Sequence, residues 1–444
     1  MSYLCGVKSW QTEMKKIVKQ YRPRVVDSLL REKLEGVGAV LIEGPKWCGK
    51  TTTAEQQAQS VLYMDNPKDR MLHLQTADVD PELLLAGDTP RLIDEWQLAP
   101  QLWDAVRFAV DHRNTDGQFI LTGSAVPLNV EENKKITHTG TGRISRLRMR
   151  PMSLWESGDS NGAVSLGELF RAPQKIAAVS DTDINRLAYL TCRGGWPRAI
   201  TQSEKVSLER AYDYYDAVIN TDIQRVDDVA RNPERVKLLM RSYARFQGTQ
   251  TSFSAICDDM KANDNTSLDD RTVYSYVNAL KKIFVVEDMP AWNPNLRSKT
   301  AIRTNDTRYF TDPSIAVAAL GLGPQDLIGD LNTFGLFFET LCVRDLRIFA
   351  EALGGTVYHY RDKDALECDA VIHLRNGAYG LVEIKLGGDR LVEEGAQTLI
   401  RLEKKIDTTR MKAPAFLMVL TGTGRYAFRR EDGVFVVPVS CLRD

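Results

Sequence analysis

The stretch at residues 39–52, which reads AVLIEGPKWCGKTT, constrains the fold of this chain more than any other. Its apolar start predicts a buried strand, and the segment that follows residue 50 predicts a helix. Between them lies the pattern G-x-x-x-x-G-K-T, with glycines at 44 and 49. Glycine lets the backbone bend so that several N–H groups point inward at phosphate oxygens. Because the pattern stands between a strand and a helix, we predict a P-loop.

The residue types of this loop predict nucleotide chemistry. Lys50 would place its ammonium between the β- and γ-phosphates, and the Thr51 hydroxyl would ligate Mg²⁺. The following helix adds the positive end of its dipole. We therefore expect ATP or ADP with Mg²⁺ as ligands. The predicted nucleotide-binding residues are Gly44, Pro45, Lys46, Trp47, Cys48, Gly49, Lys50, Thr51 and Thr52.

A second apolar strand, at residues 90–96, ends in Asp94 and Glu95. This is the Walker B pattern, in which Asp94 would hold the magnesium ion through water. Glu95 would polarise the attacking water as general base. A strand that ends in a solvated acidic turn is the simpler interpretation. The order of the two motifs, with about 45 residues between them, favours the functional one.

A third buried strand, at residues 118–124, ends in hydroxyl side chains. Ligands of open α/β sheets lie at the carboxyl ends of strands, so Ser124 or Thr122 could sense the γ-phosphate or orient water. A polar strand end that caps the next helix is an equally good interpretation.

Arginines recur after the glycine-rich turn at residues 140–142. Arg143 is placed to reach a phosphate in its own or a neighbouring subunit, as an arginine finger does. Arg146, Arg148 and Arg150 alternate with apolar residues and would share one face of a strand. The alternative is a solvated or salt-bridged edge strand.

These motifs together resemble one family. The P-loop, LIDEWQ at 92–97, ILTGS at 120–124, and GR at 142–143 followed by RPMSLWE at 150–156 are similar to a prokaryotic AAA-type ATPase family. Its members carry a C-terminal domain long labelled as of unknown function. The resemblance spans nearly the whole chain. It implies an AAA+-like ATP-binding core, a DNA-binding-like winged helix and a nuclease-like C-terminal fold.

The middle of the chain reads as helical. Residues 159–235 would form a lid over the nucleotide, with Arg193, Arg198 or Arg225 as candidates to complete its site. Residues 236–295 read as a winged helix-turn-helix, in which an amphipathic helix over 271–284 suits a recognition helix. The alternative is a helical spacer that contacts only protein. The outer face of the recognition helix would carry Arg271, Thr272, Tyr274, Ser275, Asn278 and Lys281.

The segment 331–444 returns to an α/β pattern and carries an inward-pointing Glu339, then Asp369, then Glu383 and Lys385 on one strand face. The series Glu…Asp…Glu-x-Lys resembles the PD-(D/E)xK nuclease constellation. That resemblance implies that Asp369 and Glu383 hold Mg²⁺ or Mn²⁺ with support from Glu339, while Lys385 stabilises developing charge or activates water. Gln397 would complete the site. The alternative is that this domain does not cleave DNA and is a structural relic or a reader of DNA shape with exposed carboxylates.

Composition narrows the remaining possibilities. The formal net charge is −1, so any contact with DNA must come from a local patch. The seven cysteines form no CxxC pair, which favours a reducing cytosol over a disulfide framework or a zinc site. No apolar run reaches membrane-spanning length, so we expect a cytoplasmic protein without a membrane partner.

The expected fold is α/β, with a P-loop (AAA+-like) parallel-sheet core at 1–158, a helical lid at 159–235, a winged helix at 236–295 and a PD-(D/E)xK-like domain at 296–444. The expected function is a magnesium-dependent ATPase that couples its nucleotide state to DNA or partner binding. The alternatives are an ATP-gated metal-dependent nuclease and a non-catalytic switch with slow turnover. A homo-oligomer fits the resemblance to AAA+ proteins.

Overall fold

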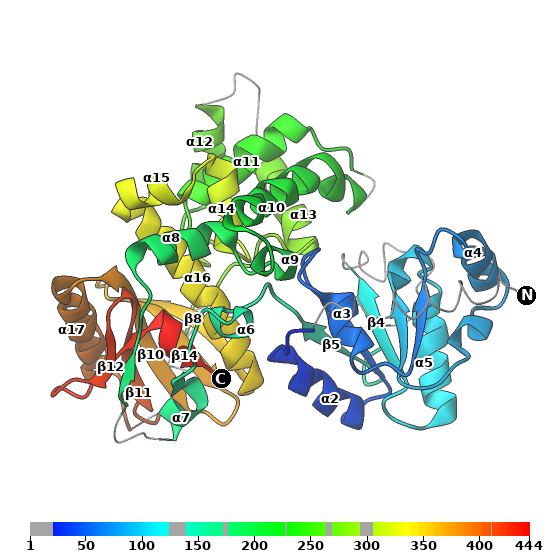
Figure 1. The fold of residues 1–444 in the computed structure, drawn as a ribbon, viewed down its shortest axis with the longest axis horizontal. Coiled ribbons are helices and arrows are strands. Elements are labelled where there is room, and N and C mark those ends of the chain that lie inside the picture. Colours follow the sequence, from blue (N-terminus) through cyan, green and yellow to red (C-terminus); the bar gives the residue numbers. More distant parts are fainter. Residues whose placement is uncertain are drawn as a thin grey trace, which may run out of the picture.

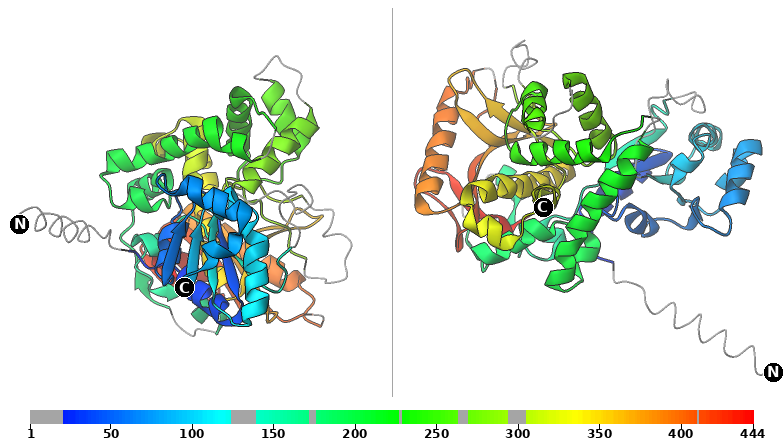
Figure 2. Two further views of the ribbon diagram at one scale, coloured as in Figure 1. Left: turned by 90° about the vertical axis from the view of Figure 1, so that its right-hand side faces the viewer. Right: turned by 90° about the horizontal axis from the view of Figure 1, so that it is seen from above.

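The computed structural model describes residues 21–123, 139–171, 176–226, 229–262, 269–293, 305–409 and 411–444. Figure 1 shows two bodies joined near residue 150. The smaller body holds the N-terminal α/β unit, and the larger one places helices above a second sheet. The right-hand view of Figure 2, from above, again shows the two bodies side by side.

The N-terminal body is built on a five-stranded sheet in the order β2-β3-β4-β1-β5, and every neighbouring pair is parallel. Strand β4 therefore lies between the P-loop strand β1 and the strand β3 that ends in Asp94. The strands are β1 Ala39–Glu43, β2 Ser60–Tyr63, β3 Arg91–Asp94, β4 Phe119–Gly123 and β5 Ile144–Arg148. The main helices are α2 Val26–Gly36, α3 Lys50–Glu55, α4 Arg70–Val79 and α5 Leu102–Arg113.

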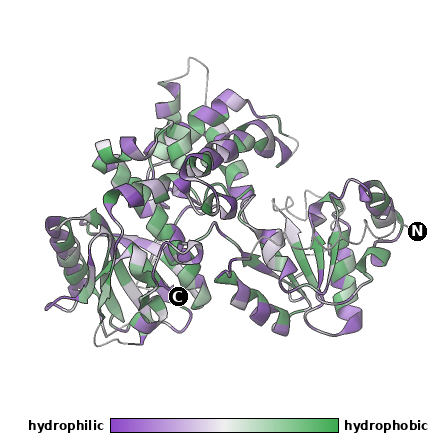
Figure 3. Ribbon diagram, in the orientation of Figure 1, coloured by the Kyte–Doolittle hydropathy of each residue, from purple (hydrophilic) through white to green (hydrophobic). Residues whose placement is uncertain are grey.

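Helices cover both faces of this sheet, which is why its central strands β1 and β4 are almost wholly apolar. Leu41 and Leu121 pack with α5 on one face, whereas Val40 and Ile120 pack with α2 on the other. Figure 3 shows the resulting apolar interior of the strands. The sequence-based prediction of a parallel-sheet core is confirmed.

The upper part of the larger body is helical. Helices α10, α11 and α14 pack together, and α15 packs on α8. After α13, the pairs Val286–Phe310 and Met289–Thr307 form isolated antiparallel bridges. The helices are α8 Ile184–Arg193, α9 Pro197–Ile200, α10 Glu204–Ala217, η3 Val218–Asp222, α11 Pro233–Arg245, α12 Phe253–Lys261, α13 Asp270–Lys282, α14 Pro313–Leu320 and α15 Pro324–Gly329.

The lower part is a seven-stranded mixed sheet in the order β7-β12-β13-β11-β10-β9-β8. Val382 and Ile384 face the apolar cluster that contains α16, while Leu381 and Val419 face α17. The sheet is therefore a middle layer between two helices. The elements are α16 Leu331–Ala352, β8 Gly355–Arg361, β9 Glu367–Leu374, β10 Tyr379–Gly387, α17 Asp389–Lys405, β11 Phe416–Thr423, β12 Tyr426–Arg429 and β13 Phe435–Pro438.

The structure divides the chain differently from the sequence-based boundaries. The short strand β6 (Val164–Ser165) pairs with β14 (Leu442–Arg443), and β7 (Ala178–Val179) pairs with β12. Strand β7 thus lies at the edge of the seven-stranded sheet, and β6 forms a separate two-stranded sheet with β14, so both strands pair with the C-terminal segment that we expected to be separate from a lid at 159–235. Residues 313–329, assigned to the C-terminal domain from sequence, pack with the helical part. The helical part and one face of the C-terminal sheet share a single apolar cluster.

No helix in the described ranges is both long and apolar enough to span a bilayer.

Candidate functional site

The P-loop connects β1 to α3 and bends tightly against the end of β5. A Cβ atom at Gly44 would lie 2.0 Å from the carbonyl oxygen of Met149, so only glycine fits there. Gly49 caps α3 in a left-handed conformation with φ of 103°, which glycine adopts without a steric penalty. The two motif glycines are therefore explained by close approach and by backbone conformation.

Lys50 and Thr51 begin α3, and their side chains contact groups at the carboxyl ends of β1 and β3. The buried Lys50 Nζ donates hydrogen bonds to the carbonyl oxygens of Gly44 and Pro45, each over 2.9 Å. Thr51 Oγ1 donates to Asp94 Oδ1 over 2.8 Å. The loop and the end of β3 are thus in direct contact, as the spacing of the two motifs predicts.

Asp94 and Glu95 lie at the carboxyl end of β3. Asp94 also accepts a hydrogen bond from Thr122 at the end of β4. Burial raises the pKa of Asp94 above its ordinary value, and the Thr122 and Thr51 hydroxyls oppose that rise. Ser124, the other hydroxyl predicted here, lies outside the described residues.

Glu95 adopts a left-handed conformation with φ of 55°, which is strained for a residue with a side chain. Its carboxylate accepts a hydrogen bond from the Gln97 amide. Burial raises the pKa of Glu95, and the negative charge of Asp94 adds to this effect. A carboxylate with a raised pKa accepts a proton more readily, which suits a general base.

Arg24 is a residue of this site that sequence reasoning missed. Its guanidinium is buried behind the P-loop and donates to the carbonyl oxygen of Cys48 over 2.9 Å and to that of Arg150 over 2.8 Å. Its Nε forms an ion pair with Glu156 at 3.0 Å. One side chain therefore fixes the loop, the end of β5 and the start of the larger body. A lone arginine before a helix gives no sequence signal of such a role.

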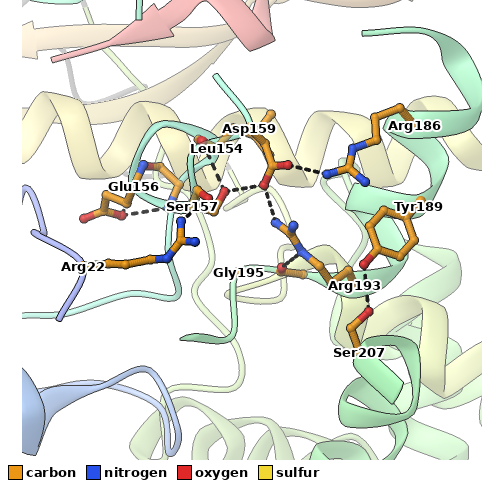
Figure 4. Close-up of polar contacts among 12 residues, drawn as sticks. Arg22, Leu154, Glu156, Ser157, Asp159, Arg186, Tyr189, Arg193, Gly195 and Ser207 are labelled. Atoms are coloured by element: carbon orange, nitrogen blue, oxygen red, sulfur yellow. Dashed lines mark hydrogen bonds and ion pairs between the residues drawn. The ribbon is translucent and has the colours of Figure 1, made fainter. Parts of the chain in front are cut away.

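The structure accounts for the predicted arginines mainly as ion pairs. Arg146 and Arg148 approach Glu43 at 3.0 and 3.7 Å, so the salt-bridged edge strand is the correct interpretation for them. Arg193 is buried against Asp159 at 2.8 Å, within the polar network of Figure 4, rather than against the P-loop. Arg150 forms ion pairs with residues of the larger body.

Arg143 is not placed to serve the P-loop of its own chain. It precedes β5, whose first residue pairs with Ala39, whereas the P-loop follows the last residue of β1. The two lie at opposite ends of a five-residue strand, about 16 Å apart at the usual rise per residue. Arg143 Nε instead donates to Asp111 over 2.7 Å. Arg143 could therefore act as an arginine finger only at the nucleotide of a neighbouring subunit, which stays a prediction.

The four polar residues of the C-terminal motif come together on β9, β10 and α16. Asp369 Oδ2 accepts from the backbone N–H of Ile384 over 2.7 Å and from Lys385 Nζ over 3.1 Å. Lys385 also pairs with Glu383, and Glu339 accepts a hydrogen bond from Tyr309. We call Glu339, Asp369, Glu383 and Lys385 the carboxylate cluster.

Burial and mutual repulsion dominate the electrostatics of the carboxylate cluster. Burial raises the pKa of Glu339 and of Glu383, and the charge of Asp369 raises both further. Burial opposes the charge on Lys385, but Asp369 and Glu383 outweigh it, and the pKa of Lys385 is raised. The lysine ammonium thus takes the position of a shared counter-ion.

The fit of a metal to the carboxylate cluster is incomplete. Within the described ranges, no three His, Cys, Asp or Glu side chains are arranged to hold a metal ion. Gln397, which we expected to complete the site, is exposed and donates to Glu393 over 2.9 Å. A divalent cation between Asp369 and Glu383 would have to displace Lys385.

The predicted recognition helix is α13, with Val273, Val277 and Leu280 buried. Tyr274 is 54% exposed and Arg271 is exposed, as the amphipathic pattern predicts. Lys281 is held at 2.7 Å by Asp288, which lowers the free positive charge of this face.

Three sequence profiles of known families match parts of this chain. Residues 37–157 match the sequence profile of an AAA domain. Residues 184–326 and 334–442 match two further profiles, each described as a domain of unknown function (DUF8612 and DUF4143). Residues 37–157 therefore define an ATP-binding domain of the AAA type. The nuclease-like character of the C-terminal domain and the winged helix stay predictions.

Uncharacterized proteins of Mycobacterium bovis and Mycobacterium tuberculosis are each 24% identical over 366 residues, which is 80% of this chain and 72% of theirs. Among solved structures, a Walker-type ATPase of Pyrococcus abyssi shares 16% identity with a TM-score of 0.41, covering 68% of this chain and 97% of its own. The replication initiator DnaA, bound to AMPPCP and single-stranded DNA, shares 15% identity with a TM-score of 0.27, covering 58% of this chain and 86% of its own.

Proposed function

We propose that this protein is a magnesium-dependent ATPase whose nucleotide state controls its binding to DNA or to a protein partner. The observation that carries the proposal is the convergence of Lys50, Thr51, Asp94 and Glu95 at one edge of a parallel sheet. These are the groups that phosphoryl transfer to water requires.

Each group has a task that follows from its surroundings. Lys50 would exchange the two carbonyl oxygens that it now contacts for phosphate oxygens. Thr51 and Asp94 would hold Mg²⁺, which supplies charge neutralisation at the phosphates. Glu95, held by Gln97, would take the proton of the attacking water.

ATP turnover by the full chain tests this proposal. We expect Glu95→Gln to lower turnover about 100-fold or more while ATP still binds, and Lys50→Ala to weaken binding itself. Arg31→Ala, at an exposed position of α2, is a control that should leave both unchanged. Equal turnover in the wild type and Glu95→Gln would reject the ATPase. Measurable ATP binding without turnover would favour the slow switch.

The exposed face of α13 supports the DNA part of the proposal. Tyr274 and Arg271 offer an aromatic ring and a cation that can contact base edges or phosphates. Anisotropy of a labelled DNA duplex, with ATP and with ADP, measures this binding. We expect Arg271→Glu to weaken DNA binding. Unchanged binding would mean that another surface contacts DNA, or that α13 binds a protein partner instead.

An arginine-finger role for Arg143 requires assembly. Mixing Arg143→Ala with Glu95→Gln chains tests it, because each mutant retains what the other lacks. Turnover above that of either mutant alone would support a shared site, and no gain would exclude it.

The carboxylate cluster supports metal-dependent DNA cleavage as a second candidate function. Lys385 contacts both Asp369 and Glu383, so one cation and two carboxylates of the kind that phosphodiester cleavage uses meet at one place. Supercoiled DNA incubated with Mn²⁺ or Mg²⁺ is the test. Cutting that disappears in Asp369→Ala would support this function, whereas cutting that survives would exclude the cluster as its site.

A further inference from the structure

The P-loop is held from outside by the helical part of the larger body. Lys46 forms an ion pair with Asp222, and the ring of Trp47 meets the ring of Tyr214 edge-on at 5.6 Å between centroids. Tyr214 lies on α10, and Asp222 ends the helical segment η3 that continues it. Two consecutive loop residues are thus fastened to one continuous helical element.

A third contact comes from the neighbouring helix α9. A Cβ atom at Gly49 would lie 3.5 Å from Pro197 Cγ, so α9 lies directly on the loop. Next to Pro197, Trp196 stacks on Tyr214 with centroids 4.2 Å apart. The Trp196 indole N–H donates to Ser314 over 2.9 Å, which ties this group to α14. A change at the loop would therefore reach several helices.

The ion pair has an unequal environment. The Asp222 side chain is only 7% exposed, whereas that of Lys46 is 34% exposed. Removing the lysine from such a pair leaves a buried carboxylate without its counter-ion, which is costly. Asp222 therefore depends on Lys46, while Lys46 can reach solvent or another anion.

The Asp222 carboxylate lies next to the P-loop, where we expect phosphate to bind. A carboxylate and a phosphate are alternative acceptors for the same ammonium. ATP brings one more phosphoryl group and more negative charge to the loop than ADP does. It therefore competes more strongly for Lys46.

The segment that carries Asp222 is suited to respond. Residues Val218–Asp222 form a π-helical turn at the end of α10. Such turns are rare and often mark functional positions, because their wider hydrogen-bonding pattern is less favourable than that of an α-helix. The Lys46–Asp222 contact fixes the end of this turn.

We propose that Lys46 and Asp222 form a switch that distinguishes ATP from ADP and passes the difference to α10. ATP draws Lys46 away from Asp222 and frees the end of the π-helical turn, whereas ADP leaves the pair in place. Asp222 is thereby a specificity-determining residue for the triphosphate. This inference rests on the proposed binding of nucleotide in the P-loop.

Affinities of ATP and ADP, measured by calorimetry on the full chain, test the switch. A Glu95→Gln background prevents hydrolysis during the titration. We expect Asp222→Asn to raise ATP affinity about fivefold relative to ADP, because Lys46 no longer has a competing carboxylate. Asp213→Asn is the matched control, since Asp213 lies on the same helix but pairs with Arg210 at the surface.

Lys46→Gln removes the same pair from its exposed side and should bring the ATP and ADP affinities together. Trp47 emission gives an independent signal, assigned by its loss in Trp47→Phe. ATP should change this emission more than ADP does, and Asp222→Asn should resemble the ATP-bound state before nucleotide is added.

The outcomes separate the two proposals. A wild-type chain that binds neither nucleotide overturns the proposed function and the switch together. A chain that binds both, with the same ATP-to-ADP ratio in the wild type and Asp222→Asn, overturns the switch alone.

Discussion

Arg150 and Glu287 form a two-pronged ion pair across the junction of the two bodies, with Nε–Oε2 at 2.9 Å and Nη2–Oε1 at 2.7 Å. Arg150 follows Met149, which contacts the P-loop, and Glu287 follows α13. Paired arginine–carboxylate geometry of this kind fixes orientation as well as charge. The pair therefore sets the position of the ATP-binding body on the rest of the molecule.

Replacing Arg150 by alanine should destabilise the protein strongly. Glu287, whose side chain is 18% exposed, then keeps only weaker interactions with Arg148 and with Arg347, whose Nη1 lies 3.7 Å from Glu287 Oε2. We expect a loss of about 3 kcal/mol in the free energy of unfolding, measured by urea denaturation. Arg146→Ala removes an exposed pair on the same segment and should cost less than about 1 kcal/mol. Equal losses would contradict the role of Arg150.

Acid should weaken the same junction. Burial alone would raise the pKa of Glu287, but Arg150 and Arg347 outweigh it and hold that pKa well below its ordinary value. A depressed pKa stabilises the fold above the unfolded value and loses that effect as pH falls toward the folded one. Stability should therefore decline below about pH 4.5, and less so in Glu287→Gln. Identical pH profiles for the two chains would exclude this contribution.

Protonation of Glu95 should determine how ATP turnover falls at acidic pH. Because burial and Asp94 raise its pKa, the acidic limb of the rate profile should lie above the range of an ordinary carboxyl. Gln97 lowers the pKa of Glu95 through its hydrogen bond, so Gln97→Ala should move this limb to higher pH. A limb that stays in place would indicate that another group limits the rate.

Arg24→Met should weaken ATP binding as well as stability, because the Cys48 carbonyl and Glu156 lose a buried partner. Calorimetric titration with ATP measures the first effect and thermal denaturation the second. The neighbouring Arg22 is exposed and donates one hydrogen bond, to the Ser157 carbonyl over 2.7 Å, so Arg22→Ala is the control (Figure 4). Loss of stability with unchanged ATP affinity would reduce Arg24 to a purely structural residue.

Lys385→Met should leave the buried Glu383 carboxylate and the partly exposed Asp369 carboxylate without their shared counter-ion. The folded state then favours the protonated form of Glu383, so the variant should lose about 3 kcal/mol near pH 8 and recover part of it toward pH 5. Added Mn²⁺ should raise its melting temperature more than that of the wild type, because the ammonium no longer occupies the position between Asp369 and Glu383. Lys405→Met, which removes the two ion pairs of an exposed lysine with Asp362 and Asp364, is the control. Absence of any manganese effect would argue against a metal at the carboxylate cluster.

The sequence was sufficient for the parts of the molecule that local chemistry defines. The P-loop and the Asp94–Glu95 strand end require particular residue types at fixed spacing, so both were visible in the chain alone. Arg24 and Asp222 contact the P-loop only through tertiary packing, and neither stands in a recognisable pattern. The pairing of β6 and β7 with C-terminal strands could not be predicted, because each has only two residues, too few to show a strand period.

The pairing of β6 with β14 has a consequence for how the chain acquires its fold. Asp444 Oδ1 accepts a hydrogen bond from the backbone N–H of Gly167 over 2.7 Å, across 277 residues of sequence. Contacts of such large separation form late and slowly. During synthesis, the segment around residue 165 must therefore remain unpaired until residues 442–444 have been made, and a chain interrupted before that point leaves this edge open to other partners.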